Sequence, residues 1–155
     1  MCEITEGVAR ARAQLLRLIK TRPRSKYEAR TRLRQKGFSN TVIEQVIEMA
    51  EANGLLDDEA FAKLWIEERA LLKPKGQQAL EQELREKGID REIISKLLKE
   101  SSLDEYAAAR QLIEERLSRY RFENPQDRER KLSAFLRRRG FSFQLINKIL
   151  KELLA

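Results

Sequence analysis

The chain contains one short stretch three times: Leu33-Arg34-Gln35-Lys36-Gly37-Phe38, Leu84-Arg85-Glu86-Lys87-Gly88-Ile89 and Leu136-Arg137-Arg138-Arg139-Gly140-Phe141. The glycines of the three copies lie 51 and then 52 residues apart, and a proline precedes each glycine by 14 or 15 residues. Self-similarity at a fixed period near 50 indicates supersecondary units that stack on one another. We therefore expect three tandem repeats rather than one irregular core.

The composition favours helix in every repeat. The 155 residues are 37% charged and 41% hydrophobic, with three prolines, and no stretch shows the apolar alternation of a strand. Each repeat divides into three helices, because a break follows its first helix and a glycine ends its second. The predicted class is all-α, with three tandem three-helix repeats in an elongated array that stacking could curve. The predicted repeats are 1–56, 57–102 and 103–155.

Local signals predict where helices begin and end. Ser25 is an expected N-cap that forms a capping box with Glu28, and Ser39 or Asn40 caps the next helix. Gly37 fits a left-handed C-cap that a β-carbon would disfavour. The corresponding start signals further on are Asp57-Asp58-Glu59, Asp90, Ser102-Leu103-Asp104-Glu105 and Ser142.

Apolar spacing predicts which side chains are buried. The second helix of each repeat should pack Leu33, Leu84 or Leu136 against paired apolar residues of the third helix, such as Val42 and Ile43. In the first helix of the middle repeat, the expected core residues are Phe61, Leu64 and Trp65, with Leu71 and Leu72 as weaker candidates.

The positive charge is concentrated at the two ends of the chain. The formal net charge is +7, with +5 in residues 1–53, −2 in residues 54–102 and +4 in residues 103–155. A basic balance favours a polyanionic partner or an acidic protein surface. The acidic middle argues against a protein that coats DNA uniformly.

Enzymatic chemistry has little support in these residues. The chain lacks histidine, which removes His-based acid–base catalysis and most zinc sites, and its glycines stand singly rather than in a phosphate-binding loop. One cysteine, Cys2, excludes an internal disulfide and a zinc cluster. We expect no catalytic residues, no metal and no cofactor. The N-terminal stretch does not resemble a signal peptide and no stretch resembles a membrane span, so we expect a cytoplasmic protein.

Two arginine-rich clusters are the strongest functional signal, because arginine suits phosphate and carboxylate partners. For any single residue, a solvated helix face or a favourable charge at a helix C-terminus is the simpler interpretation. Similar clusters in two repeats favour binding. The candidates for contact are Arg22, Arg24, Lys26, Arg30 and Arg34 in the first repeat, and Arg119, Arg121, Arg128, Arg130, Lys131, Arg137 and Arg138 in the third.

Aromatic residues are mostly expected in the core. Tyr120 and Phe122 differ, because they alternate with Arg119 and Arg121 in a break between helices. They could stack on bases, although covering a helix end is the more common role of such residues.

The sequence resembles the RecX family of recombinase regulators. The resemblance is carried by the first glycine stretch with Val42-Ile43 and Val46-Ile47, by the segment from Gly54 to Ala62, and by Lys75-Gly76 with the second glycine stretch. It extends over nearly the whole chain, and the structural signature comprises Leu33, Gly37, Asp57, Asp58, Phe61, Leu84, Gly88, Leu136 and Gly140. One departure is Trp65, where the family often has a tyrosine.

The resemblance implies a monomer that binds the filament of RecA on single-stranded DNA. Members are understood to lie in the filament groove, to suppress its ATPase, strand-exchange and coprotease activities, and to hinder filament growth. Some also bind DNA directly, so single-stranded and double-stranded DNA are further candidate partners.

Two other interpretations stay open. A helical protein that acts on DNA alone would bind bare DNA with a steep salt dependence. An inert helical scaffold would respond to neither RecA nor DNA.

Overall fold

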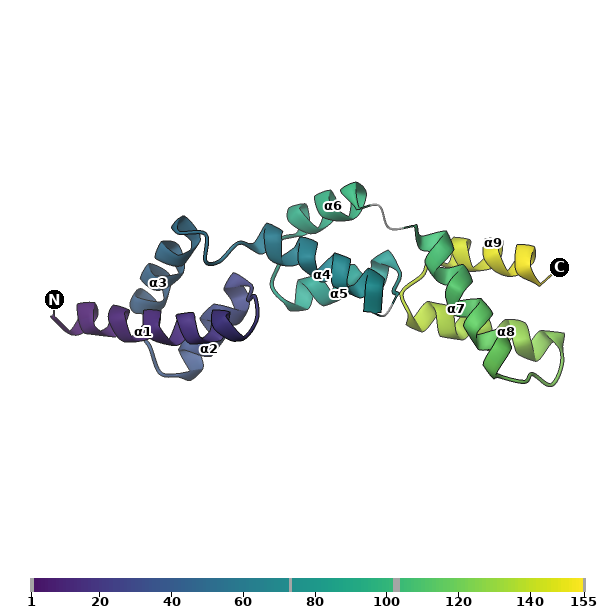
Figure 1. Ribbon diagram of the computed structural model, residues 1–155, viewed down its shortest axis with the longest axis horizontal. Coiled ribbons are helices and arrows are strands. Elements are labelled where there is room, and N and C mark those ends of the chain that lie inside the picture. Colours follow the sequence, from purple (N-terminus) through teal and green to yellow (C-terminus); the bar gives the residue numbers. More distant parts are fainter. Residues whose placement is uncertain (1, 73, 102–103, 155) are drawn as a thin grey trace. The chain divides into compact units, whose positions relative to one another are not determined.

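The computed structural model describes residues 2–72, 74–101 and 104–154, with side chains from residue 5 onward (Figure 1). Within these ranges all regular structure is α-helical, which confirms the predicted class. The helices are α1 (Cys2–Thr21), α2 (Lys26–Gln35), α3 (Asn40–Ala52), α4 (Asp58–Leu72), α5 (Gln77–Glu86), α6 (Arg91–Glu100), α7 (Glu105–Arg119), α8 (Pro125–Arg138) and α9 (Phe143–Leu153). No helix among the described residues is long and apolar enough to cross a membrane.

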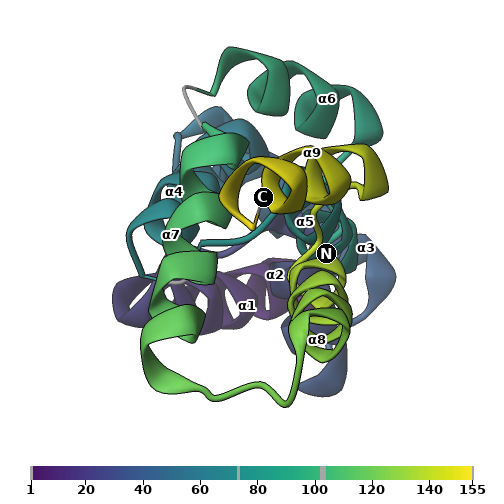
Figure 2. The same cartoon turned by 90° about the vertical axis from the view of Figure 1, so that its right-hand side faces the viewer.

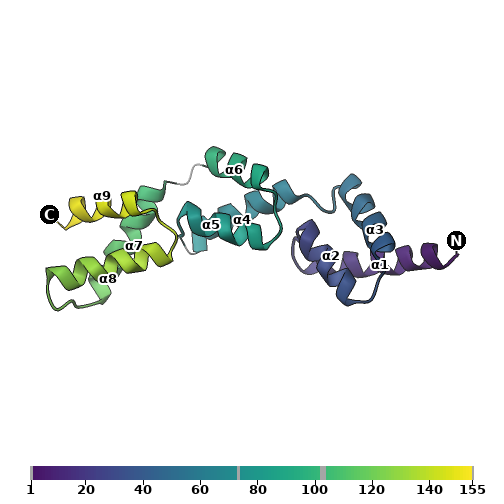
Figure 3. The same ribbon diagram turned by 180° about the vertical axis from the view of Figure 1, so that it is seen from behind.

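The helices α1, α2 and α3 pack on one another around a common core (Figure 3). The predicted inner face of α3 is confirmed, since Val42, Ile43, Val46, Ile47 and Ala50 are all buried. Leu33 of α2 is completely buried against them. Because α2 is short and highly polar, most of its stability comes from this packing rather than from helix propensity.

The helices α7, α8 and α9 form an equivalent bundle (Figure 2). Leu136 of α8 is completely buried and packs with Ile146 and Ile149 of α9. Asp104 caps α7 and Ser142 caps α9, each accepting a backbone N–H with its side chain. Both fall within the expected start signals, of which Ser102 and Leu103 lie outside the described residues. Asn124 caps α8, with Pro125 at the first position of that helix.

The chain divides into two compact units whose limits fall inside the middle repeat. The first unit comprises residues 1–64 and 84–94, and the second comprises residues 65–83 and 95–155. Each unit thus holds a terminal repeat and part of the middle one, because α4, α5 and α6 contribute to both. The repeat boundaries given above remain predictions.

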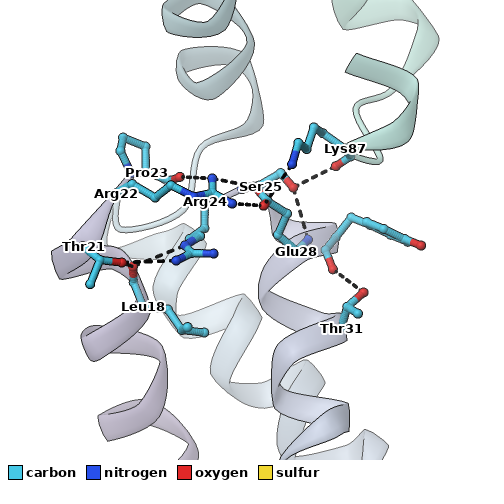
Figure 4. Close-up of polar contacts among 10 residues, drawn as sticks. Leu18, Thr21, Arg22, Pro23, Arg24, Ser25, Glu28, Thr31 and Lys87 are labelled. Carbon is cyan, nitrogen blue, oxygen red and sulfur yellow. Dashed lines mark hydrogen bonds and ion pairs between the residues drawn. The ribbon is translucent and has the colours of Figure 1, made fainter. Parts of the chain in front are cut away.

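In the first unit, hydrogen bonds join the start of α2 to the middle repeat, and Figure 4 draws the one from Ser25 to Lys87. The Ser25 hydroxyl donates to the carbonyl oxygen of Lys87 over 2.7 Å, and the Lys26 backbone N–H donates to Asp58 Oδ1 over 2.8 Å. Ser25 also accepts from the Glu28 backbone N–H, which completes the predicted capping box. Ser25 is fully buried, and these bonds satisfy its hydroxyl.

In the second unit, the start of α5 is joined to the third repeat in the same way. The Gly76 backbone N–H donates to the carbonyl oxygen of Arg139 over 2.8 Å. The Gln77 backbone N–H donates to Glu105 Oε1 over 2.6 Å. Both junctions therefore place the N-terminus of one second helix against the C-terminal turn of the next repeat's second helix. In both, a carboxylate at the start of the next repeat's first helix caps the junction.

The repeated glycines serve these junctions as well as the helix C-caps. Gly88 and Gly140 have φ of +75° and +90°, a region that side chains with a β-carbon rarely adopt. A β-carbon on Gly88 would lie 2.3 Å from Cβ of Tyr27, and one on Gly140 would lie 2.3 Å from Cβ of Ala79. Gly37 also has a positive φ, but no atom lies within 4 Å of its would-be β-carbon.

The expected core of α4 is only partly correct. Phe61 is buried and Trp65 is half-buried, but Leu64 is 39% exposed. The buried face is completed by Ala62 and Ile66 instead. Because each residue turns the helix by about 100°, Leu71 points away from that face. Leu72 is in phase with Phe61 and Trp65, but no residue of α4 after Ile66 is buried. Leu71 and Leu72 are accordingly 85% and 75% exposed.

Candidate nucleic-acid interface

The basic stripe of α2, defined by Lys26, Arg30 and Arg34, is largely neutralised by α3. The Arg30 guanidinium makes two hydrogen bonds to Glu44, of 2.9 and 3.3 Å, and the Lys26 ammonium pairs with Glu51. The hydrogen bond to Glu51 raises the pKa of Lys26. Within the described ranges, only Arg34 of this stripe forms no ion pair.

Arg22 and Arg24 hold the connection between α1 and α2 (Figure 4). Arg22 pairs with Glu28, and Arg24 donates to the carbonyl oxygen of Leu18 near the end of α1 over 3.3 Å. Burial alone would raise the pKa of Glu28, but its hydrogen bond from Arg22 and other donors lower it overall. These two arginines are therefore engaged inside the first unit.

A polar cluster around Glu83 ties α4 to α5 in the second unit. The indole Nε1 of Trp65 donates to Glu83 over 2.9 Å, Arg69 Nε does so over 3.2 Å, and Lys75 forms an ion pair with the same carboxylate. Burial opposes ionisation of Glu83, but these donors lower its pKa overall. Trp65 thus has a hydrogen-bonding role as well as the packing role expected of it.

Part of the third-repeat basic cluster is bound to Asp127. Arg130 and Lys131 lie 2.8 and 3.1 Å from its two carboxylate oxygens, and the Glu123 backbone N–H donates to it over 3.2 Å. Hydrogen bonds from Lys131, Arg130 and Glu123 lower the pKa of Asp127 to about 2. Asp127 therefore stays charged at neutral pH and offsets part of the positive charge of these two residues.

The remaining arginines of the third-repeat basic cluster are less engaged with carboxylates. Arg119, Arg121, Arg137 and Arg138 are exposed and form no ion pair within the part of the chain that the structure describes. Arg128 is half-buried, and its Nε atom has no hydrogen-bond partner there. The third repeat therefore offers more uncompensated positive charge than the α2 stripe.

A groove of about 350 Å³ runs between the C-terminal end of α7 and α8, and we call it the α7–α8 groove. It brings together three of the predicted contact residues, Arg121, Lys131 and Arg138, and it excludes Arg119, Arg128, Arg130 and Arg137. Both predicted aromatics line it, but they differ: Phe122 is half-buried against the core, whereas Tyr120 is 52% exposed. The full lining is Arg116, Tyr120, Arg121, Phe122, Lys131, Leu132, Ala134, Phe135 and Arg138.

Arg116 is the residue of this groove that the sequence reasoning missed. Its guanidinium carbon lies 3.8 Å from the ring centre of Phe135 and 4.7 Å from that of Tyr120. The guanidinium carbon of Arg139 lies 5.2 Å from the ring centre of Phe135 as well. The four-residue spacing of Arg116 and Tyr120 across the end of a predicted helix was the available signal.

The site contains no catalytic constellation that we can identify. Among the residues that the structure describes, no group of His, Cys, Asp and Glu side chains could hold a metal ion. The ionisable groups are engaged in helix caps, in ion pairs or in basic surfaces. The fold and its surfaces thus define an all-α protein of three-helix repeats with exposed basic surfaces.

Comparison with known proteins identifies the family. The chain matches the first RecX three-helix domain over residues 11–48, the second over residues 57–98 and the third over residues 104–150. The chain belongs to the RecX family, and it is a regulatory protein rather than an enzyme.

Related sequences agree over most of the chain. A protein of Pelodictyon phaeoclathratiforme named Regulatory protein RecX is 41% identical over 89% of this chain and 85% of its own. A protein of the same name from Mycolicibacterium vanbaalenii is 36% identical over 90% of this chain and 80% of its own. The crystal structure of RecX from Lactobacillus salivarius has the same fold, with a TM-score of 0.86, 22% identity and coverage of 96% of this chain and 97% of that one.

Proposed function

We propose that this protein binds the RecA filament on single-stranded DNA and inhibits its ATPase, strand-exchange and coprotease activities. The observation that carries the proposal is the match to all three RecX domains in order along the chain. The uneven charge supports it, because a basic first repeat and third repeat flank a middle segment of net charge −2. A filament presents both protein and DNA surfaces. Such a partner suits a chain with basic ends and an acidic middle better than a continuous phosphate backbone does.

The proposed partners are the RecA filament and DNA, and the protein acts as a cytoplasmic monomer. Cytoplasmic action follows from these partners. The contact residues proposed earlier remain the candidates, with more weight on the third repeat, where Arg119, Arg121, Arg137 and Arg138 form no ion pair in the described structure.

The test is the ATPase of RecA on preformed filaments, measured while this protein is titrated in below the RecA concentration. Substoichiometric inhibition, with weak binding to bare DNA at the same salt, would support the filament regulator. An ATPase that is unaffected at every ratio would contradict it.

A second candidate function is a helical protein that acts on DNA directly. The α7–α8 groove favours it, because exposed aromatic and guanidinium groups meet there. It predicts inhibition only when the protein is abundant enough to coat the DNA, and a steep loss of binding with salt.

A further inference from the structure

We propose that the α7–α8 groove binds one nucleotide of single-stranded nucleic acid, with its base stacked on Tyr120 and its phosphates held by Arg121 and Arg138. This inference deepens the proposed function and rests on it, since it assigns the direct DNA contact to one place. It lies wholly within the second unit.

The apolar lining of the groove suits the face of a base. Leu132 and Phe135 line it while being almost fully buried, and half-buried Phe122 packs beside the same core. Aromatic rings stack on any base because every base has a π-face. A volume of about 350 Å³ falls within the range of about 300–1,000 Å³ that is typical of small-ligand sites.

Tyr120 is the residue that can take part in stacking. It is 52% exposed, so much of its surface remains open to a ligand, while Phe135 is only 5% exposed. The guanidinium carbon of Arg116 lies 4.7 Å from the ring centre of Tyr120 and 3.8 Å from that of Phe135, so it contacts both rings. A planar base can then occupy a surface that needs no rearrangement of the core.

The charges that line the groove suit a phosphate. Its four cations are Arg116, Arg121, Lys131 and Arg138, and no carboxylate lines it. Arg116 is committed to the rings and Lys131 to Asp127, 3.1 Å away. Arg121 and Arg138 are exposed without an ion pair among the described residues, so their forked donors are available to phosphate oxygens.

Single strands fit this chemistry better than a duplex. Stacking requires an exposed base face, and base pairs in a duplex hide those faces within the helix. Arg121 and Arg138 would contact the phosphate backbone of a single strand or of a duplex. We therefore expect the affinity of the groove for a strand to depend on the presence of bases and not only on the charge of the strand.

The first experiment compares the full-length protein on a labelled oligothymidylate and on an abasic strand with the same number of phosphates, by fluorescence anisotropy. The wild type should bind the oligothymidylate about 5- to 150-fold more tightly, the range expected for one stacked base. Tyr120→Leu should remove this preference while leaving the affinity for the abasic strand unchanged. Phe143→Leu is the matched control, because Phe143 is an aromatic of the same repeat that is 62% exposed and lies outside the groove.

The second experiment tests the phosphate contacts. The Arg121→Gln/Arg138→Gln double variant should weaken binding of both strands and reduce the salt slope by about 1.4, since each phosphate contact contributes about 0.7 on single strands. An unchanged slope would overturn the assignment of these arginines. A preference for the base that survives Tyr120→Leu, or an equal loss of duplex binding in that variant, would overturn the stacking site.

These outcomes are separate from the proposed function. If Tyr120→Leu binds both bare strands like the wild type but inhibits the RecA ATPase less, the groove contacts protein and the inference fails while the filament function stands. If the wild type does not inhibit the ATPase but Tyr120→Leu abolishes the base preference, the filament function fails while the groove stands.

Discussion

Replacement of the repeat glycines by alanine separates the two roles that the structure gives them. Gly37 and Gly88 occupy equivalent turns, both with positive φ, but only Gly88 faces a neighbouring repeat. Gly37→Ala therefore tests the helix C-cap alone, and Gly88→Ala tests the C-cap together with the junction.

The expected magnitudes differ. A left-handed conformation costs a residue with a β-carbon about 1–2 kcal/mol, of which the lower entropy of the unfolded alanine chain offsets about 0.4–1 kcal/mol. We expect Gly37→Ala to lower the free energy of unfolding by about 1 kcal/mol. The new methyl group of Gly88→Ala would lie 2.3 Å from Cβ of Tyr27, an atom fixed to the backbone of α2. Overpacking of this kind adds about 1–3 kcal/mol, which gives a total of about 2–4 kcal/mol.

The assay is urea unfolding followed by far-UV circular dichroism for both variants and the wild type. Gly140→Ala is the parallel case in the second unit, because its methyl group would lie 2.3 Å from Cβ of Ala79, and it should behave like Gly88→Ala. Equal losses for Gly37→Ala and Gly88→Ala would refute the reasoning, because the close approach at the junction would then contribute nothing.

Three further predictions concern the charged groups. Arg30→Glu should lower the melting temperature by about 2 °C because it places two carboxylates together at Glu44. Arg34→Glu should lower it less, because it only places a negative charge at the C-terminal end of α2; equal shifts in thermal unfolding would contradict the pairing. Asp127→Asn should be less stable than the wild type at neutral pH. The folded pKa of Asp127, about 2, lies below the ordinary value, so its stabilisation is present above about pH 4 and is lost as the pH falls through the folded pKa. The difference between the two proteins in urea unfolding should therefore narrow in acid, and a difference independent of pH would count against this. Glu83→Gln should lower the free energy of unfolding by about 1–3 kcal/mol, because one amide oxygen cannot replace a carboxylate that accepts from three donors. Fluorescence of the single tryptophan during unfolding measures this, and an unchanged midpoint would exclude the cluster as a stabilising contact.

The local features of the fold were predictable because short-range chemistry determines them. Ser25 and Glu28 are three residues apart, so a capping box can be recognised without tertiary information. The apolar face of α3 follows from helical spacing in the same way. The glycine period gave the number of repeats, since only a repeated turn requires the same residue at the same interval.

The junctions and the charge state of the basic surfaces could not be predicted from spacing. The bond from Ser25 to Lys87 joins residues that are 62 positions apart, and no local pattern in either segment predicts it. The sequence does not show that Arg30 in the α2 stripe is paired, because the carboxylate that neutralises it belongs to a different helix. Leu71 and Leu72 are apolar enough to be buried, but burial also depends on which face of α4, and how much of its length, packs against a neighbour.

The sequence predicted the kind of candidate site, a basic surface with aromatic residues, but only some of the residues that form it. Aromatic and basic residues alternate in a break between helices, and this pattern indicated Tyr120 and Arg121 as candidates. Both line the α7–α8 groove. Arg116 and Phe135 complete that groove, but they come from α7 and α8, and only the packing of those helices brings them together.

The most direct test of the central claim is the rate of ATP hydrolysis by RecA on preformed single-stranded DNA filaments, with this protein titrated in well below the RecA concentration. The account predicts a marked fall in the rate at substoichiometric ratios, at a salt concentration where binding to bare DNA is weak. A rate that falls only when the protein is abundant enough to coat the DNA, or that does not fall at all, would contradict it.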